Sequence, residues 1–164
     1  MQVTLVPWGA DDIEVLRRTN TAELTRFLGG PEPDAELAQR HTEYLAEEGA
    51  AWMFRVMADG VTVGYAGWWE QDHDGEPAFE VGCVIESAWQ GRGLASAALA
   101  DVVRRAVASG GGRPIVGYAN VGNEASHALC RRVGFEFEGT AAFPATDGGD
   151  PVEVAVWVIR PETG

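Results

Sequence analysis

The sequence contains no lysine, and its 12 basic residues are all arginines, set against 25 aspartates and glutamates. The net charge of −13 argues against non-specific binding to nucleic acid, because such binding requires a basic surface. The same acidic balance favours the approach of a cationic amine. No apolar run approaches the roughly 20 residues that a membrane span requires, so we expect no membrane insertion.

Cysteine and histidine are also scarce. The two cysteines, Cys83 and Cys130, lie in apolar surroundings without the spacing of a metal site, and the three histidines are scattered along the chain. We therefore expect no metal centre. Residues 1–4 carry no basic start typical of a signal peptide, and we expect a cytoplasmic protein. The 164 residues are expected to form one domain, 1–164.

Hydrophobic periodicity predicts a mixed α/β chain with a single sheet. Strands are expected at 3–6, 52–57, 61–70, 78–86, 114–119, 135–141 and 152–159. Helices are expected at 11–19, 34–48, 94–109 and 123–133, and residues 21–28 are expected to form one or two helical turns. The dipeptide Asp59-Gly60 predicts a hairpin, whereas residues 71–77 are expected to be a polar loop and residues 143–151 a loose one.

Helix starts and helix faces follow from the same pattern. Asp11, Asp34 and Asn123 precede predicted helices and are expected to cap them. The helix at 34–48 has one face that is expected to pack inward, with its histidine as a partnered core residue. That face consists of Leu37, His41, Tyr44 and Leu45.

The chain is organised around the segment that joins the strand at 78–86 to the helix at 94–109. It reads Trp89-Gln90-Gly91-Arg92-Gly93-Leu94-Ala95. Two glycines at a strand-to-helix turn leave N–H groups unpaired at the positive end of the helix dipole, which suits a phosphate. A glycine also lets a pyrophosphate approach the backbone. Taken alone, such a glycine pair indicates an ordinary tight turn rather than a phosphate site.

A second segment changes that balance. The form Gln90-x-x-Gly93-x-Ala95 is followed, about thirty residues later, by Asn123-Glu124-Ala125-Ser126-His127-Ala128-Leu129-Cys130-Arg131-Arg132-Val133-Gly134-Phe135. In this order the two segments resemble the signature segments of the GNAT family, the acetyl-CoA-dependent N-acetyltransferases. The sequence looks most like the branch that includes ribosomal-protein N-terminal acetyltransferases, which also holds many small-molecule acetyltransferases.

The resemblance implies a fold and a co-substrate. The fold is a single splayed, mainly antiparallel sheet of about seven strands flanked by helices. In it, the strand before the glycine turn and the strand after its helix are parallel neighbours that diverge. The co-substrate is acetyl-CoA, and the implied binding residues are Cys83, Val84, Ile85, Gln90, Gly91, Arg92, Gly93, Leu94, Ala95, Ser96, Asn123 and Ser126.

Within that set, the backbone from Gly91 to Ala95 is expected to hold the pyrophosphate. The resemblance places the pantetheine arm and an oxyanion donor on the backbone of residues 83–85. Asn123 and Ser126 are expected both to fix a helix start and to approach the CoA arm. Arg131 and Arg132 are further candidates for local positive charge.

Three residues are candidates for proton transfer. Glu80 lies near the position where many family members hold a glutamate base; the alternatives are an ion pair with Arg55, and a chain of waters in place of a base. Cys130 occupies the position of a tyrosine acid in many members, so this chain departs from the pattern there. Tyr118 is expected to take the place of this acid. Cys130 is more simply interpreted as a small core residue. An acetylated Cys83 intermediate ranks below direct attack.

We therefore expect an acyltransferase that moves an acetyl group to a primary amine, of a small molecule or a peptide N-terminus, by direct attack in a ternary complex. One alternative is a catalytically quiet acyl-CoA-binding or sensing domain. Another is a transferase of a larger acyl group such as succinyl. The expected partner is the amine substrate, with no nucleic acid and no membrane, and a homodimer is left open.

Overall fold

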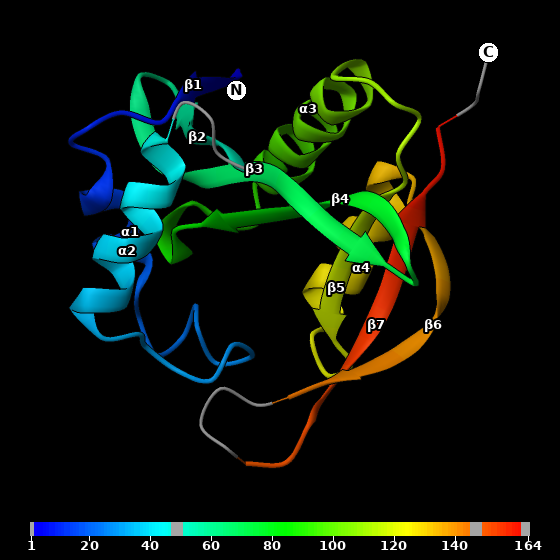
Figure 1. Cartoon of the computed structure of the whole chain (residues 1–164). Helices are drawn as coiled ribbons and strands as arrows, with labels where there is room; N and C mark the ends of the chain where they lie inside the picture. The colour runs from blue at the N-terminus through cyan, green and yellow to red at the C-terminus, as the bar shows by residue number, and fades with distance from the viewer. Residues whose placement is uncertain (1, 47–50, 145–148, 162–164) are drawn as a thin grey trace.

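Seven strands form one sheet in the order β1-β2-β3-β4-β5-β7-β6 (Figure 1). The structure is a computed structural model and describes residues 2–46, 51–144 and 149–161. Every neighbouring pair of strands is antiparallel except β4 and β5, which are parallel. The strands are β1 (Val3–Pro7), β2 (Ala51–Ala58), β3 (Val61–His73), β4 (Glu76–Ile85), β5 (Ile115–Asn120), β6 (Glu136–Phe143) and β7 (Val152–Ile159). The predicted mixed α/β fold is confirmed.

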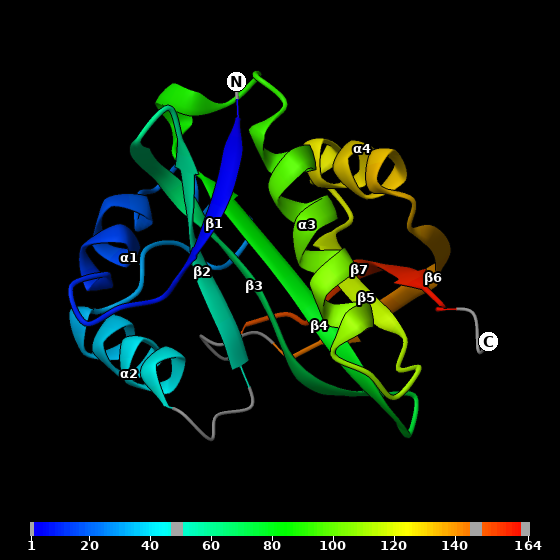
Figure 2. The same cartoon turned by 90° about the horizontal axis from the view of Figure 1, so that it is seen from above.

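Two pairs of helices cover the two faces of the sheet (Figure 2). On one face, α1 (Ile13–Thr19) and α2 (Asp34–Leu45) pack over β2 and β3. On the other face, α3 (Leu94–Ala108) packs over β3 and β4, and α4 (Glu124–Val133) packs over β5. The place where β4 meets β5 is therefore covered by α3 and α4 on one face, whereas α1 and α2 pack over β2 and β3 on the other.

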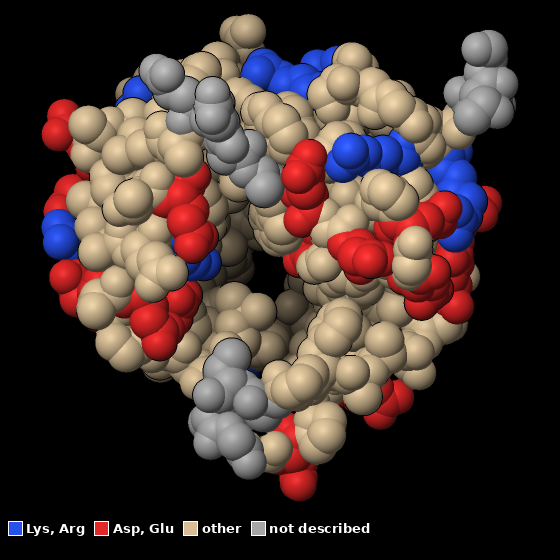
Figure 3. Space-filling model, viewed as in Figure 1, with Lys and Arg blue, Asp and Glu red and all other residues tan. Residues whose placement is uncertain are grey.

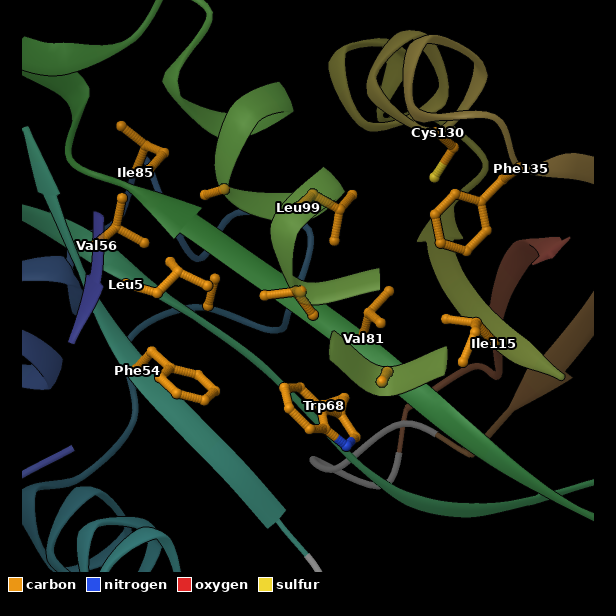
Figure 4. Close-up of a cluster of buried hydrophobic side chains, with 14 of the residues drawn as sticks. Leu5, Phe54, Val56, Trp68, Val81, Ile85, Leu99, Ile115, Cys130 and Phe135 are labelled. Carbon is orange, nitrogen blue, oxygen red and sulfur yellow. The ribbon is translucent and has the colours of Figure 1, made fainter. Parts of the chain in front are cut away.

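The larger hydrophobic core lies between the sheet and the layer of α3 and α4 (Figure 4). The i, i+4 spacing of α3 buries one face of this helix, which consists of Leu94, Ala98, Leu99, Val102 and Ala106. The strands oppose it with Leu5, Phe54, Val56, Trp68, Val81, Ile85 and Ile115. A smaller core beneath α1 and α2 contains Trp8, Val15, Leu16, Leu37 and Met53.

The hairpin between β3 and β4 is longer than predicted. The polar loop expected at 71–77 is wrong, because β3 runs to His73 and β4 begins at Glu76. Asp74 and Gly75 make the turn with φ angles of 51° and 81°. Positive φ at both central residues is typical of a two-residue hairpin turn. The extension places seven residues expected to be irregular into the sheet or its turn.

Two of the predicted helix caps are corrected. The residue before α1 is Asp12, not Asp11, and its carboxylate accepts a hydrogen bond from Gly9 N–H at 2.7 Å instead of capping the helix. α2 begins at Asp34 itself, directly after Pro33. A proline is well placed before a helix, because it cannot extend the helix backward.

The segment 21–28, predicted to form one or two helical turns, consists of consecutive turns, and Thr25 N–H donates to Thr21 C=O at 3.0 Å. α2 ends at Leu45, which is 39% exposed and therefore does not belong to the predicted inward face. His41 of that face is partnered, since Trp8 Nε1 donates to its Nδ1 at 2.9 Å. The predicted helix residues 47 and 48, and residues 145–148 of the predicted loop, lie outside the described residues.

Candidate active site

β4 and β5 are paired over only two positions, Phe79 with Ile115 and Glu80 with Val116. Beyond these positions β4 continues to Ile85 and β5 continues to Asn120, with no further pairing between them in the described part of the chain. The strands therefore diverge, as the resemblance implies. A parallel pair that opens in this way leaves N–H and C=O groups available to an extended ligand.

The hydrogen-bond alternation between β3 and β4 shows which groups face the gap. Glu86 N–H donates to Val63 C=O at 2.8 Å, which places Ile85 in a non-hydrogen-bonded pair with β3. The backbone groups of Ile85, and of Cys83 two residues before it, therefore point away from β3 and into the gap. Val84, between them, directs its backbone groups to β3.

The glycine turn follows the open edge of β4 at once. Gly91 and Gly93 both have φ of 78°, and a Cβ atom at either position would meet no atom within 4 Å. Gly93 is the N-cap of α3, and no side chain of the described residues caps that helix. The N–H groups of its first turn, residues 94–96, therefore face an open space at the positive end of the helix dipole. Such a helix start is typical of anion-binding sites.

Arginine side chains flank this turn despite the acidic total. The Arg92 guanidinium lies 4.9 Å from the centre of the Trp89 ring, which holds it beside the turn. Arg132 reaches across from α4, and its Nη1 donates to Ser96 Oγ at 2.8 Å. Arg131 instead stacks over an aromatic ring of β7. Two of the three predicted arginines therefore supply positive charge at the turn.

Two polar side chains fix the ends of this region. Gln90 Nε2 donates to Ile85 C=O at 3.0 Å and so ties the turn to the last residue of β4. Asn123 Oδ1 accepts from Ser126 N–H at 3.2 Å, which confirms Asn123 as the cap of α4. The side-chain amide of Gln90, one of the implied CoA-binding residues, thus holds the turn against the end of β4.

Glu80 stands at the last paired position of β4, where the gap begins. Burial raises the pKa of its carboxyl group, and hydrogen bonds from Gln71 and Trp69 oppose this rise. Gln71 Nε2 donates to Glu80 Oε1 at 2.9 Å. The alternative partner, Arg55, is wrong, because Arg55 Nε lies 3.2 Å from Asp12 Oδ2. Glu80 is therefore a half-buried carboxyl group with no arginine beside it in the described residues.

Tyr118 lies on the same face of the sheet as Glu80, because it is two residues beyond Val116, the partner of Glu80. Its hydroxyl oxygen lies 2.8 Å from His73 Nδ1, and its ring meets Phe143 edge-on with 5.0 Å between ring centres. Burial raises the pKa of the phenol, and the Glu80 carboxylate adds to the rise. Tyr118 therefore keeps its proton over the neutral range.

The two cysteines face the opposite side, toward the main core. Cys130 is 7% exposed, and its Sγ lies 3.8 Å from the place that a Cβ of Gly117 would occupy. Burial raises the pKa of the Cys130 thiol to about 11 and that of Cys83 to about 12. Neither side chain is a thiolate at neutral pH, which disfavours an acetyl-cysteine intermediate.

Figure 3 shows a hollow between the half of the molecule that carries α1 and α2 and the half that carries β5, β7 and β6, with acidic side chains around its mouth. On the β6 and β7 side lies an open pocket of about 220 Å³. Its lining includes Asp72, His73, Asp74, Tyr118, Glu138 and Phe143. The pocket therefore lies on the face of the sheet that carries Glu80.

Sequence reasoning missed Gln71 and His73, which contact Glu80 and Tyr118. Both missed residues lie in the segment expected to be a loop. The signal that could have found them is Asp74-Gly75, the same dipeptide that predicts the hairpin at residues 59–60. A turn there fixes the register of β3 against β4, and so places both side chains on the face that carries Glu80.

A family model for an acetyltransferase (GNAT) domain matches residues 2–136. The chain belongs to the GNAT acetyltransferase family. The resemblance drawn from the two signature segments is therefore confirmed, and the protein is an acyltransferase enzyme. A comparison with the sequences of curated proteins gave no match.

Solved structures of the same fold include a putative acetyltransferase from Acinetobacter baylyi, with a TM-score of 0.77 and 20% identity over 99% of this chain and 95% of that one. A ribosomal-protein-alanine N-acetyltransferase from Brucella melitensis has a TM-score of 0.77 and 19% identity over 98% and 100%. The aminoglycoside acetyltransferase AAC(6')-Ib in complex with coenzyme A has a TM-score of 0.78 and 17% identity over 97% and 95%. Identities this low show a common fold alone, so the branch within the family stays a prediction.

The described residues also bear on membrane insertion and on metal binding. Within 2–46, 51–144 and 149–161, no helix is long and apolar enough to cross a membrane. Over those ranges, no group of three or more His, Cys, Asp or Glu side chains is arranged to hold a metal ion. The candidate site consists of the gap between β4 and β5 and the glycine turn before α3.

Proposed function

We propose that this GNAT protein is an acetyl-CoA-dependent N-acetyltransferase that acts on a primary amine, either of a small molecule or at a peptide N-terminus. The observation that carries the proposal is that the open edge of β4 leads directly into the glycine turn. One ligand with an extended arm and a pyrophosphate can occupy both. Neighbours of the same fold described as coenzyme A complexes support acetyl-CoA as that ligand.

The pyrophosphate is assigned to the N–H groups of residues 91–96, where a Cβ at either glycine would protrude into the space. Arg92 and Arg132 offset its charge, and Arg132 is held there by Ser96. Gln90 keeps the turn at the end of β4. These assignments need local positive charge only, so they are compatible with the acidic total.

The pantetheine arm is assigned to the open edge, where Cys83 and Ile85 direct backbone groups into the gap. The Val84 side chain lies on the face of the sheet that carries Glu80. We assign Cys83 N–H as the donor to the thioester carbonyl, and a preorganised donor of this kind contributes about 2.7–4 kcal/mol in other acyl transfers. Asn123 and Ser126 approach the arm from the start of α4.

Glu80 is the proposed general base. An alkylamine with a pKa near 10.4 is only about 0.1% neutral at pH 7.4, so removal of a proton is required for most of the bound amine. The raised pKa of Glu80 brings it closer to the working pH of a base, and its place at the opening of the gap brings it to the substrate. The neutral amine attacks the thioester carbonyl and forms the C–N bond. Its nitrogen releases a second proton to solvent as the C–S bond breaks, and CoA leaves as a thiolate.

Tyr118 is the proposed proton donor to that thiolate. It keeps its proton at neutral pH and stands on the Glu80 face, at the edge of the pocket. Cys130, the other candidate, packs in the core on the opposite face, with a thiol that is also protonated. The polar surroundings of Tyr118 favour it over Cys130 for this role.

Ligand binding is tested first, by thermal melting with CoA, acetyl-CoA, succinyl-CoA, ATP and NAD. CoA species should raise the melting temperature selectively, and Gly93→Trp, which fills the turn, should abolish the rise. Gly60→Trp is the matched control, since Gly60 also has φ of 78° and open space around its Cβ position but lies in a distant hairpin. An equal loss in both variants would withdraw the site.

Turnover is tested next, by release of free CoA thiol with a panel of primary amines. Release that depends on both substrates, with intersecting initial-rate patterns, supports direct attack in a ternary complex. A faster rate with succinyl-CoA in competition would reassign the acyl group. The second candidate function is a quiet acyl-CoA-binding domain, which the core position of Cys130 favours; tight CoA binding without thiol release would establish it.

A further inference from the structure

His73 is a buried imidazole in an unusual place, the last residue of β3 before a two-residue turn. Hairpin ends are normally exposed, yet His73 is 7% exposed. It is buried because its side chain turns onto the Glu80 face of the sheet, where its Nδ1 lies 2.8 Å from the Tyr118 hydroxyl oxygen. The proposed chemistry leaves this contact without a role.

The position of the Tyr118 oxygen is set by its ring. The ring meets Phe143 edge-on and lies 5.9 Å from the imidazole, centre to centre. The direction of its single O–H is not set by the ring, because the hydroxyl rotates. If the phenol donates to His73, its proton is withheld from the cleft. If His73 Nδ1–H donates to the phenol oxygen, the phenol proton is free to point into the cleft.

We propose that His73 is a positioning residue for the acetyl transfer, which orients the Tyr118 proton toward the departing thiolate by donating Nδ1–H to the Tyr118 oxygen. The inference rests on the proposed function and adds a residue to it. A charged imidazole can only donate. A neutral imidazole can also accept from the phenol in one of its two tautomers, so it orients the proton less strictly.

Most of the charged groups around His73 are carboxylates. Asp74 Oδ2 lies 3.7 Å from its Nε2, and Asp72 and Glu138 line the same pocket. Glu80 lies beyond Tyr118 on the same face. Arg160 is the nearby cation, and it is engaged by Glu76 and Glu138. The carboxylates therefore outnumber the cation on the pocket side of the imidazole.

The test compares kcat of the wild type, His73→Leu, His73→Asn, Tyr118→Phe and the double variant His73→Leu/Tyr118→Phe. Tyr118→Phe should lower kcat about a hundredfold, the low end for general acid catalysis. His73→Leu should lower kcat about tenfold with no change in KM for acetyl-CoA, and the double variant should equal Tyr118→Phe. His73→Asn keeps an amide N–H near the place of Nδ1 and should retain most of the rate.

A second set of double variants distinguishes orientation from packing. In the His73→Asn background, Tyr118→Phe should lower kcat by nearly the full hundredfold, because the amide N–H still donates to the phenol oxygen, whereas in the His73→Leu background it should lower kcat only about tenfold. His127→Asn is the matched control, because His127 is equally buried and accepts from Trp157 Nε1 at 3.3 Å. In its background Tyr118→Phe should keep its full effect.

Additive losses in the double variant, or a lower melting temperature of His73→Leu with kcat unchanged, would overturn this inference and leave the proposed function intact. If His73→Leu fails to fold, His73→Phe replaces it in the double variant, because its ring fills the place of the imidazole and carries no hydrogen-bond donor. Absence of turnover with every amine tested would overturn the proposed function, and the inference with it.

Discussion

The ten residues of β4 are paired along one edge of the strand and mostly unpaired along the other. Toward β3, the register runs unbroken from Glu76 to Ile85, whereas toward β5 it stops after two pairs. The paired edge supplies the cooperative stability of a sheet. At the open edge, the backbone groups of Cys83 and Ile85 point into the gap. Stability and ligand binding are thus separable by mutation.

The largest expected effect comes from the start of the open edge. Glu80→Gln should lower kcat/KM about 10²–10⁴-fold at pH 7.5, because the proposed base is removed while the shape of the side chain is kept. The acidic limb of the pH–rate profile should disappear with it. Glu70→Gln, an exposed glutamate on β3 paired with Arg113, is the control and should leave that limb in place. If Glu80→Gln keeps the full rate, a water chain takes the proton instead.

The paired edge is tested by a methyl group. A Cβ at Gly64 would lie 2.0 Å from Val84 C=O, so Gly64→Ala forces β3 and β4 apart and should lower the free energy of unfolding by about 3 kcal/mol. Gly117→Ala, on the open strand β5, meets nothing closer than 3.8 Å and should change it by less than about 1 kcal/mol. Chemical denaturation measures both. Equal losses would mean that the two edges are equally tight.

A smaller effect is expected where the open edge ends. Gln90→Ala removes the hydrogen bond to Ile85 C=O and frees the turn from the strand. A net loss of about 0.5–1.5 kcal/mol should appear as a roughly two- to tenfold weaker CoA affinity in calorimetry. Gln39→Ala on exposed α2 serves as the reference. Weaker folding without weaker CoA binding would show that Gln90 stabilises the fold alone.

The two edges also differ in how well sequence reasoning describes them. The order of the elements along the chain, the glycine turn and the α4 cap at Asn123 follow from local patterns and from the two signature segments. The face of α3 follows from its spacing. These features depend on residues close together in the chain, where propensity and periodicity act directly.

What the sequence did not reveal depends on register between distant residues. The contacts of Gln71 with Glu80, of His73 with Tyr118 and of Arg55 with Asp12 arise only when strands and loops are aligned in space. The Asp74-Gly75 pair does predict a hairpin turn, and the register that it sets places Gln71 and His73 on the face that carries Glu80.

The smallest effect concerns the contribution of the Glu80 carboxyl group to the stability of the fold. Burial raises its pKa in the fold, so the folded and unfolded chains both hold the proton at low pH. As pH rises through the ordinary glutamate range, the unfolded chain releases the proton first, and the folded state loses stability until Glu80 ionises in the fold as well. Glu80→Gln carries no charge. It should therefore match the wild type in melting temperature near pH 4 and exceed it at pH 7.5. A wild-type advantage at pH 7.5 would mean that a cation pairs with Glu80, and the open edge would then lack its base.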